Sequence, residues 1–323
     1  MTEISPPAGF LTIQSPGPFT TVQDLGRSGF LASGFSPSGA MDAFSARMAN
    51  LLVGNPQGEA VLEMTIEGIT AGFSKPCVFS LTGADMTPTL NGRSIPLWAA
   101  CVAKSGDILR CGIAKTGCRG YLAISGGFLL PSPMGSASTN LKCRLGGFQG
   151  RKLEKGDWLP LRAAVSALPG LEWRTAPPLE ENAAPLLRVI PGPQHRCFTA
   201  KGIKTFYHSS YLLTPQSDRM GARLEGPPIE AKGGVDILSD GIAFGAVQIP
   251  ASGKPIVLLA DRQTTGGYAK IGTVATVDLP LLAQAKPGSK LRFVPCTVKK
   301  AQTLLRQQEK MIAAFAHRLS SLK

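Results

Sequence analysis

Short apolar runs alternate with turn residues along most of the chain, and this alternation constrains the fold more than any other feature. Residues 78–83 and 108–111 are such runs, and the pair Asn91-Gly92 lies between them. Asn-Gly is typical of a type I′ turn in a two-residue β-hairpin, because both residues tolerate positive φ. We therefore expect an antiparallel β domain at residues 10–165.

One helical segment interrupts this pattern at residues 41–52, where apolar side chains recur at helical spacing. Either Ser38 or Asp42 offers a side chain that can cap its N-terminus. The segment predicts a helix within the β domain.

The second half repeats the strand pattern after a break. Around residues 166–185 the periodicity is lost and Ala, Pro and Glu collect, which predicts an exposed linker. Strand patterns return at 186–297 and predict a second β domain. Apolar residues at three- and four-residue spacing then predict an amphipathic helix at 298–323, which packs on its own domain or binds a partner. The fold class is therefore mainly β, with two domains and a few helices.

Composition excludes several classes of protein. No run of about 18 apolar residues occurs, and the first ten residues include Glu3 and two prolines, so we expect a cytoplasmic protein with no membrane contact. The net charge of +13 is spread along the chain without a nucleic-acid-binding motif, so no nucleic-acid partner is expected. The charge indicates a solvated basic surface, or a face for an acidic partner or an anionic substrate.

The cysteines predict neither disulfides nor a metal site. They number seven, an odd count, and form no CxxC pair, so we interpret them as reduced and mostly buried thiols. His195 and Cys197 are the one close pairing of the two residue types.

Three polar segments set among glycines are candidates for chemistry. In the first, residues 21–42, Asp24 and Arg27 either hold a polar substrate or form a local ion pair in a surface turn. In the second, Arg219 and Arg223 share a face if the segment is helical, which would make a clamp for an anion; the alternative is a solvated basic turn.

The third segment combines residues 245–250 with 259–268, where an apolar strand runs directly into charged and amide side chains. A rigid strand end aims such groups. Gln248, Asp261 and Gln263 together supply donors and acceptors for an amide or urea-like group, and Arg262 supplies a cation for an anion.

These segments together resemble a known family. The resemblance covers about residues 14–291 and is carried by residues 21–27, 38–42, 106–109, 119–127, 217–221 and 261–268. They are similar to the carboxyltransferase domain of urea amidolyase and to its stand-alone relatives. Those relatives include the C subunit of bacterial 5-oxoprolinase, also described as the antagonist of a sporulation-kinase inhibitor.

The resemblance implies two cyclophilin-like β-barrel domains whose polar motifs face a shared cleft. It implies one component of an ATP-hydrolysing 5-oxoprolinase that opens the 5-oxoproline lactam to glutamate, and therefore a cyclic-amide hydrolase active only as a hetero-oligomer. The expected partners are the allophanate-hydrolase-like B subunit of 5-oxoprolinase and its lactam-utilisation A subunit. ATP is expected at the level of the complex, with no covalently bound cofactor and no metal.

Two other functions stay open. One is a biotin-dependent carboxyltransferase acting on urea or another amide, with carboxybiotin carried by another protein. The other is a non-catalytic antagonist of a kinase inhibitor, against which the polar motifs speak because binding faces rely more on aromatic and aliphatic anchors.

The resemblance and the residue chemistry together assign roles. Arginines are expected to bind an anion or oxyanion, amide side chains to bind the substrate amide, and carboxylates to orient protons or act as bases. The expected catalytic residues are Asp24, Arg27, Asp261 and Arg262. The expected substrate-binding residues are Gln23, Ser38, Asp42, Arg219, Arg223, Gln248, Gln263 and Tyr268.

Overall fold

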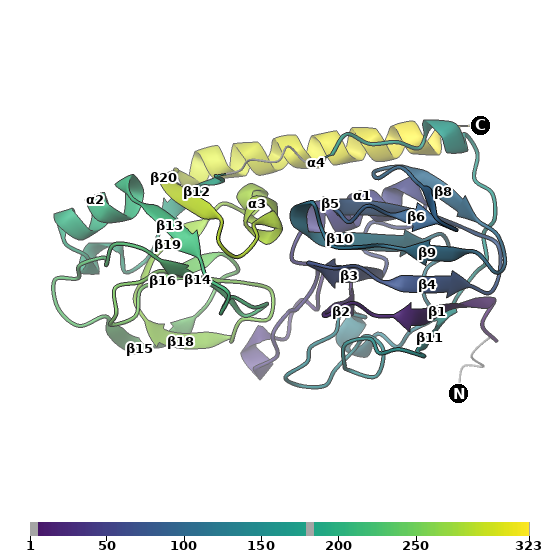
Figure 1. Cartoon of the computed structure of the whole chain (residues 1–323). Coiled ribbons are helices and arrows are strands. Elements are labelled where there is room, and N and C mark those ends of the chain that lie inside the picture. Colours follow the sequence, from purple (N-terminus) through teal and green to yellow (C-terminus); the bar gives the residue numbers. More distant parts are fainter. Residues whose placement is uncertain (1–5, 179–183, 323) are drawn as a thin grey trace. The chain divides into compact units, whose positions relative to one another are not determined.

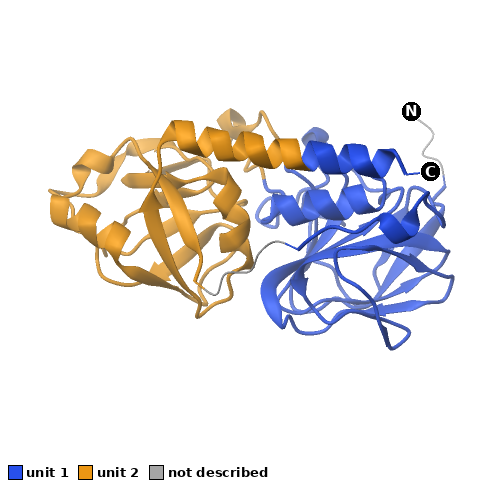
Figure 2. Cartoon of the chain, turned by 90° about the horizontal axis from the view of Figure 1, so that it is seen from above, with its two compact units in different colours: residues 1–27, 38–180, 312–323 blue, residues 28–37, 181–311 orange. Residues whose placement is uncertain are grey.

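The computed structural model describes residues 6–178 and 184–322, which form two compact units. Unit 1 comprises residues 1–27, 38–180 and 312–323, and unit 2 comprises residues 28–37 and 181–311 (Figure 2). Part of the predicted linker, residues 179–183, lies outside the described residues, as do residues 1–5 and 323. The described part of the linker contains a short 3₁₀ turn at Leu171–Trp173.

Unit 1 is built from two antiparallel sheets (Figure 1). In the described residues, one sheet has the strand order β11-β1-β4-β9-β6-β7 and the other β2-β3-β10-β5-β8. The strands are β1 Gly9–Ser15, β2 Thr20–Gln23, β3 Val61–Thr65, β4 Thr70–Phe73, β5 Cys77–Asp85, β6 Thr89–Leu90, β7 Arg93–Ser94, β8 Ala100–Ala103, β9 Ile108–Arg110, β10 Thr116–Ile124 and β11 Trp158–Leu161.

The core of unit 1 lies between these sheets, and strand β10 explains how. Leu122 and Ile124 point into the core shared by both sheets, whereas Tyr121 and Ala123 point to the opposite face and pack under helix α1 (Ala43–Leu52). Side chains alternate between the two faces of a strand. Strand β10 is apolar at successive positions because both of its faces are covered.

Two local predictions for unit 1 are confirmed. Strands β6 and β7 pair around Asn91 and Gly92, whose φ values are 51° and 78°, as a type I′ turn requires. Helix α1 begins after Asp42, whose carboxylate accepts a hydrogen bond from the Ser45 backbone N–H at 2.9 Å. Asp42, not Ser38, is therefore the N-cap of the predicted helix.

Unit 2 contains a closed barrel with the strand order β12-β19-β16-β17-β14-β13-β20, and a separate two-stranded sheet β15-β18. Neighbouring barrel strands are antiparallel, except that β12 and β20 are parallel. The strands are β12 Leu186–Pro191, β13 Ser210–Leu213, β14 Gly221–Glu225, β15 Asp236–Gly241, β16 Ala246–Gln248, β17 Ile256–Leu258, β18 Thr265–Tyr268, β19 Lys270–Val274 and β20 Lys290–Pro295.

Three further helices complete the described chain: α2 (Ala200–His208), α3 (Leu279–Gln284) and α4 (Val298–Ser320). Phe206 of α2 stacks on Phe293 of β20 with ring centroids 4.5 Å apart, which fixes α2 against the barrel. In the last turns of α4, Ile312 packs with Phe44 and Trp98 of unit 1. The mainly β class, the closed barrel and the C-terminal helix agree with the sequence predictions. Among the described residues, no helix combines the length and apolar character needed to cross a membrane.

Candidate functional site

The carboxylate of Asp24 organises the first polar segment. It accepts hydrogen bonds from the Gly26 N–H at 2.7 Å, the Ala137 N–H at 2.6 Å and the Ser136 hydroxyl at 2.7 Å, and a fourth from the Ser138 hydroxyl. Asp24 is 9% exposed. Its lone pairs are thus used by protein donors, and the carboxylate joins the turn after β2 to the loop at 136–138.

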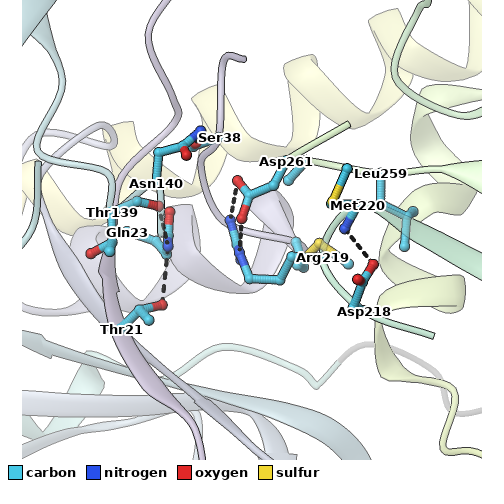
Figure 3. A network of polar contacts seen from close by, with 12 residues as sticks. Thr21, Gln23, Ser38, Thr139, Asn140, Asp218, Arg219, Met220, Leu259 and Asp261 are labelled. Atoms are coloured by element: carbon cyan, nitrogen blue, oxygen red, sulfur yellow. Dashed lines mark hydrogen bonds and ion pairs between the residues drawn. The ribbon is translucent and has the colours of Figure 1, made fainter. Parts of the chain in front are cut away.

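Gln23 and Arg27 flank this carboxylate within unit 1. The Gln23 amide Nε2 donates to the Thr21 hydroxyl at 3.0 Å and to the Thr139 carbonyl at 3.2 Å (Figure 3), while its Oε1 is buried with no hydrogen-bond partner among the described residues. Arg27 is 2% exposed and donates from Nη2 to the Ser138 carbonyl. The loop that holds Asp24 therefore also holds both neighbours.

Ser38 and Asp42 make separate buried hydrogen bonds in unit 1. Ser38, with a φ of 55°, accepts a hydrogen bond from the Asn140 amide at 3.1 Å. Both carboxylate oxygens of Asp42 accept hydrogen bonds from Ser45, and the Asp42 N–H donates to the Tyr121 hydroxyl at 2.9 Å. Burial, followed by nearby carboxylates, raises the pKa of Tyr121 well above its usual value, so Tyr121 stays protonated.

The loop at 136–140 was missed by sequence reasoning, although it contacts Asp24, Gln23, Arg27 and Ser38. The sequence feature that could have identified this loop is the polar run Ser-Ala-Ser-Thr-Asn, which the adjacent glycines Gly146 and Gly147 follow. A Cβ on Gly146 would lie 2.2 Å from the Ser138 carbonyl oxygen, and one on Gly147 would lie 1.9 Å from the Thr139 hydroxyl. Both glycines are required because the loop packs directly on their backbone.

In unit 2, Arg219 and Asp261 form an ion pair whose side chains are 7% and 13% exposed (Figure 3). Arg219 donates from Nε to one carboxylate oxygen at 2.8 Å and from Nη2 to the other at 3.3 Å, and the Asp261 N–H donates to the Arg219 carbonyl at 2.8 Å. The bidentate geometry orients both groups.

The prediction that Arg219 and Arg223 share one face of a helix and form a clamp is wrong. Arg219 precedes β14 in a turn stabilised by Asp218, whose carboxylate accepts the Met220 and Gly221 N–H groups at 2.8 and 3.0 Å. Arg223 lies within β14 and is exposed. The four-residue spacing of the arginines does not distinguish a helix from a turn followed by a strand. Here the turn is followed by strand β14, which pairs with β17.

Arg262 is a buried cation without a carboxylate partner among the described residues. It is 5% exposed, and it donates from Nε to the Ile242 carbonyl at 3.0 Å and from Nη1 to the Leu259 carbonyl at 3.2 Å. Its guanidinium lies over the Phe244 ring, 5.5 Å from the centroid. Burial lowers the pKa of Arg262, which reflects the cost of keeping this charge away from water.

Gln248 and Gln263 converge on Gly266. A Cβ placed on Gly266 would lie 2.8 Å from Gln248 Nε2 and 3.5 Å from Gln263 Nε2. Gln248 is 2% exposed, and its Nε2 is buried without a hydrogen-bond partner among the described residues. Tyr268, at the end of β18, is 42% exposed.

The structure brings some of the predicted residues together within each unit. In unit 1, Gln23, Asp24 and Arg27 contact one loop. In unit 2, Arg219 pairs with Asp261, and the amides of Gln248 and Gln263 both lie near Gly266. Among the described residues, no cluster of His, Cys, Asp and Glu is suited to a metal ion, and all seven cysteines are free thiols.

The chain is similar to known proteins over most of its length. Residues 33–295 match the family model described as "Carboxyltransferase domain, subdomain A and B". The chain is 38% identical to the C subunit of 5-oxoprolinase from Haemophilus influenzae, covering 90% of this chain and 92% of that protein. It is also 38% identical to the C subunit of 5-oxoprolinase from Escherichia coli, covering 96% of this chain and 98% of that protein.

A solved structure matches over nearly the whole chain. The urea amidolyase of K. lactis superposes with a TM-score of 0.89 at 31% identity, and the match covers 97% of this chain and 20% of the urea amidolyase. The chain thus corresponds to one fifth of that larger enzyme. On the family model, the relatives and the fold together, the chain belongs to the carboxyltransferase-domain family that includes the C subunit of 5-oxoprolinase and this part of urea amidolyase.

Proposed function

We propose that this chain is one component of an ATP-dependent 5-oxoprolinase complex that opens the 5-oxoproline lactam to glutamate. Its partners are the allophanate-hydrolase-like B subunit of that enzyme and the lactam-utilisation A subunit. ATP is used at the level of the complex, and the complex works in the cytoplasm as a hetero-oligomer.

The observation that carries this proposal is the extent of the match. The chain covers 92% and 98% of two relatives named as the C subunit of 5-oxoprolinase, at 38% identity to each. It covers only 18% of the urea amidolyases of Lachancea kluyveri and Saccharomyces cerevisiae, at 33% and 31% identity. A protein that matches a relative from end to end at higher identity is more directly comparable with it than with one portion of a larger enzyme.

The chemistry of the unit 2 residues supports an amide substrate. Opening a lactam builds negative charge on its carbonyl oxygen, and preorganised donors stabilise such charge in a site shielded from water. Gln248 supplies a buried donor that has no acceptor among the described residues. Arg262 supplies a buried positive charge that no described carboxylate neutralises, and it therefore favours an anionic group nearby.

The carboxylates take positioning roles in this proposal. Asp24 has its acceptor positions filled by backbone and serine donors, so it holds the loop that carries Gln23 and Arg27. Asp261 fixes Arg219 through both of its oxygens. Arg262 is then the expected catalytic residue to which this proposal assigns the contact with substrate charge, because no described carboxylate neutralises it.

The test is reconstitution with the two partner proteins. We expect the complex of this chain with the A and B subunits to couple 5-oxoproline-dependent ATP hydrolysis to glutamate formation, and the complex without this chain to lack both. An assembled complex that leaves 5-oxoproline unchanged would refute the proposal.

A second candidate function is a biotin-dependent carboxyltransferase, which the TM-score of 0.89 to a urea amidolyase favours. In this case carboxybiotin arrives on another protein, and the carboxyl acceptor is urea or another amide. The donors near Gly266 suit the carbonyl oxygen of such a planar group equally well. Bicarbonate-dependent carboxylation of urea, seen only when a biotinylated carrier and this chain are both added, would establish this candidate instead.

A further inference from the structure

An open cavity of about 530 Å³ lies in unit 1 beside strands β6 and β9 of the six-stranded sheet (Figure 1). The residues that line this cavity, here called the Arg110 cavity, include Thr87, Thr89, Asn91, Ile108 and Arg110. None of its lining residues is among the predicted site residues. Its volume is within the range typical of small-molecule sites.

Arg110 gives this cavity a positive charge. It is the one charged residue in the lining, and its backbone is fixed in β9 by pairing with β4 on one side and β6 on the other. Its side chain is exposed and makes no hydrogen bond or ion pair within the described ranges 6–178 and 184–322. The guanidinium is therefore available to a ligand.

Two carboxylates lie close to the cavity in sequence, but neither lines it. Asp85 accepts the Thr87 N–H at 2.8 Å. Asp107 accepts the Asn91 side-chain amide and the Lys104 N–H, both at 2.7 Å. Both carboxylates thus support the turns around the cavity, and neither forms an ion pair with Arg110.

Two threonine hydroxyls line the cavity together with Arg110. Thr89 lies directly opposite Arg110 in the β6–β9 pairing, and opposite residues of an antiparallel pair present neighbouring side chains on one face. Thr87 has a φ of 46°, in the left-handed region that β-branched residues rarely adopt. Neither hydroxyl has a hydrogen-bond partner among the residues that the structure describes. Strained backbone of this kind is typical of ligand-binding positions.

These groups together favour a carboxylate on an apolar body. The planar guanidinium matches a carboxylate with two parallel hydrogen bonds, and a hydroxyl can donate to a remaining lone pair. A single arginine balances the single charge of a carboxylate, whereas a phosphate group carries nearly two charges at neutral pH. Ile108, two residues before Arg110 on β9, points to the same face and is 40% exposed, so it offers an apolar contact.

We propose that the Arg110 cavity is a binding site for a small organic carboxylate. Arg110 holds the carboxylate, Thr87 and Thr89 donate to its oxygens, and Ile108 contacts the apolar body. This site is additional to the proposed 5-oxoprolinase function and does not depend on it.

Three variants test the site. Arg110→Met removes the cation and keeps an unbranched side chain, and Thr87→Val removes a hydroxyl and keeps the β-branched shape. Arg93→Met is the matched control, because Arg93 is an exposed arginine on β7 of the same sheet and does not line the cavity.

Thermal unfolding of the full chain is the first measurement. Since the Arg110 side chain has no partner in the described part of the chain, we expect Arg110→Met and Arg93→Met to unfold within about 2 °C of wild type. A clearly lower midpoint for Arg110→Met alone would show that Arg110 supports the fold, and would overturn its assignment as a ligand-binding cation.

Calorimetric titration of the full chain with three probes is the second measurement. Phenylacetate carries a carboxylate on an apolar ring, 2-phenylethanol replaces the carboxylate by a neutral hydroxyl, and inorganic phosphate is an anion without an apolar body. We expect wild type to bind phenylacetate in preference to the other two. Arg110→Met should bind it roughly tenfold more weakly or worse, and Thr87→Val about threefold more weakly or worse.

Two controls show where phenylacetate binds. Arg93→Met and Arg262→Met should both bind it as wild type does, because neither variant changes the Arg110 cavity. No binding by wild type, equal binding by Arg110→Met, or equal weakening in Arg93→Met would each refute the site. Weakening in Arg262→Met alone would place the probe at the candidate functional site and would also refute it. Preference for phosphate would refute the carboxylate assignment.

The two proposals fail independently. All of these measurements use the chain without partner subunits, so a reconstituted complex that leaves 5-oxoproline unchanged would refute the proposed function and leave the carboxylate site standing. An active complex, together with a chain that does not bind phenylacetate, would refute the carboxylate site alone.

Discussion

Replacing Arg262 by methionine separates a functional charge from a structural one. Methionine keeps an unbranched chain of similar reach over the Phe244 ring and removes the guanidinium. Because Arg262 is expected to bind an anion, we expect its replacement to abolish activity with little loss of folding. The contacts of Arg262 allow the folding part of that expectation to be worked through.

Two terms of opposite sign set the stability of Arg262→Met. The Leu259 carbonyl keeps a partner because it also accepts the Arg262 backbone N–H at 3.2 Å, so only the Ile242 carbonyl loses its side-chain donor, at a cost of about 1–3 kcal/mol. Against this, the variant no longer buries a cation without a counter-charge, a penalty of several kcal/mol in proteins. The two terms are similar in size, and we expect the free energy of unfolding to change by no more than about 1 kcal/mol.

Arg188→Met is the contrasting variant. Arg188 donates from Nε to Asp278 at 2.8 Å, and Asp278 is 0% exposed. Removing this guanidinium leaves the buried carboxylate, among the described residues, with donation from the Arg188 backbone N–H alone, at 2.7 Å. The Arg188 side chain is 34% exposed, but the carboxylate that would lose its partner is fully buried, and such a loss costs about 3 kcal/mol. We therefore expect Arg188→Met to be clearly less stable than Arg262→Met.

Urea unfolding of both variants, followed with one spectroscopic probe, measures this difference. Assay of the reconstituted complex should then show kcat/KM for 5-oxoproline reduced by about 100-fold or more in Arg262→Met, a loss typical of removing a group that stabilises developing charge. An Arg262→Met variant as unstable as Arg188→Met, or one with full activity, would refute the reasoning that Arg262 binds a substrate anion and contributes little to the stability of the fold.

Three further predictions concern the supporting structure. Gly39→Ala should lower the free energy of unfolding by about 2 kcal/mol or more and reduce activity, because Gly39 has a φ of 95° and a Cβ there would lie 2.9 Å from the Gly26 backbone nitrogen. Gly34 has a φ of 82° with nothing within 4 Å, so Gly34→Ala should lower it by only about 1 kcal/mol in the same urea titration. Equal losses in the two variants would contradict the steric argument. Burial raises the pKa of Tyr211 to about 12, whereas a tyrosine in the unfolded chain has a pKa near 10. The contribution of Tyr211 to the free energy of unfolding should therefore be complete below about pH 10 and decrease as the pH rises toward about 12. Unchanged unfolding midpoints across that interval would be inconsistent with this prediction. In the folded protein at pH 8, a thiol reagent should label Cys143 and Cys197 rapidly, because these two side chains are exposed, and rapid labelling of all seven thiols would disagree with the structure.

The sequence predicted the turn and the helix start that depend only on residues adjacent in the chain. The Asn91-Gly92 turn follows from backbone preferences of two residues, and the Asp42 cap follows from one carboxylate next to an apolar stripe. The 219–223 segment shows the limit of such reasoning. Its arginine spacing favours a helix as readily as a turn and strand, and only pairing with β17 decides between them.

The candidate site depends on contacts between residues far apart in sequence. Asp24 is bound by serines that follow it by 112 and 114 residues, so a single sequence offers no means of connecting them. The unpaired donor of Gln248 is visible only as a missing contact, which no residue pattern encodes. The sequence could therefore name Asp24 and Gln248 as candidates, but it could not tell that the first is saturated with donors and the second is not.

The most direct test of the central claim is to follow ¹³C-labelled 5-oxoproline by NMR in a mixture of ATP and the A and B subunits, with and without this chain. We predict that labelled glutamate forms only when this chain is present, and that Arg262→Met slows its formation by about 100-fold or more while the complex still assembles. Glutamate formation at the same rate without the chain, or none from the fully assembled wild-type complex, would contradict the account.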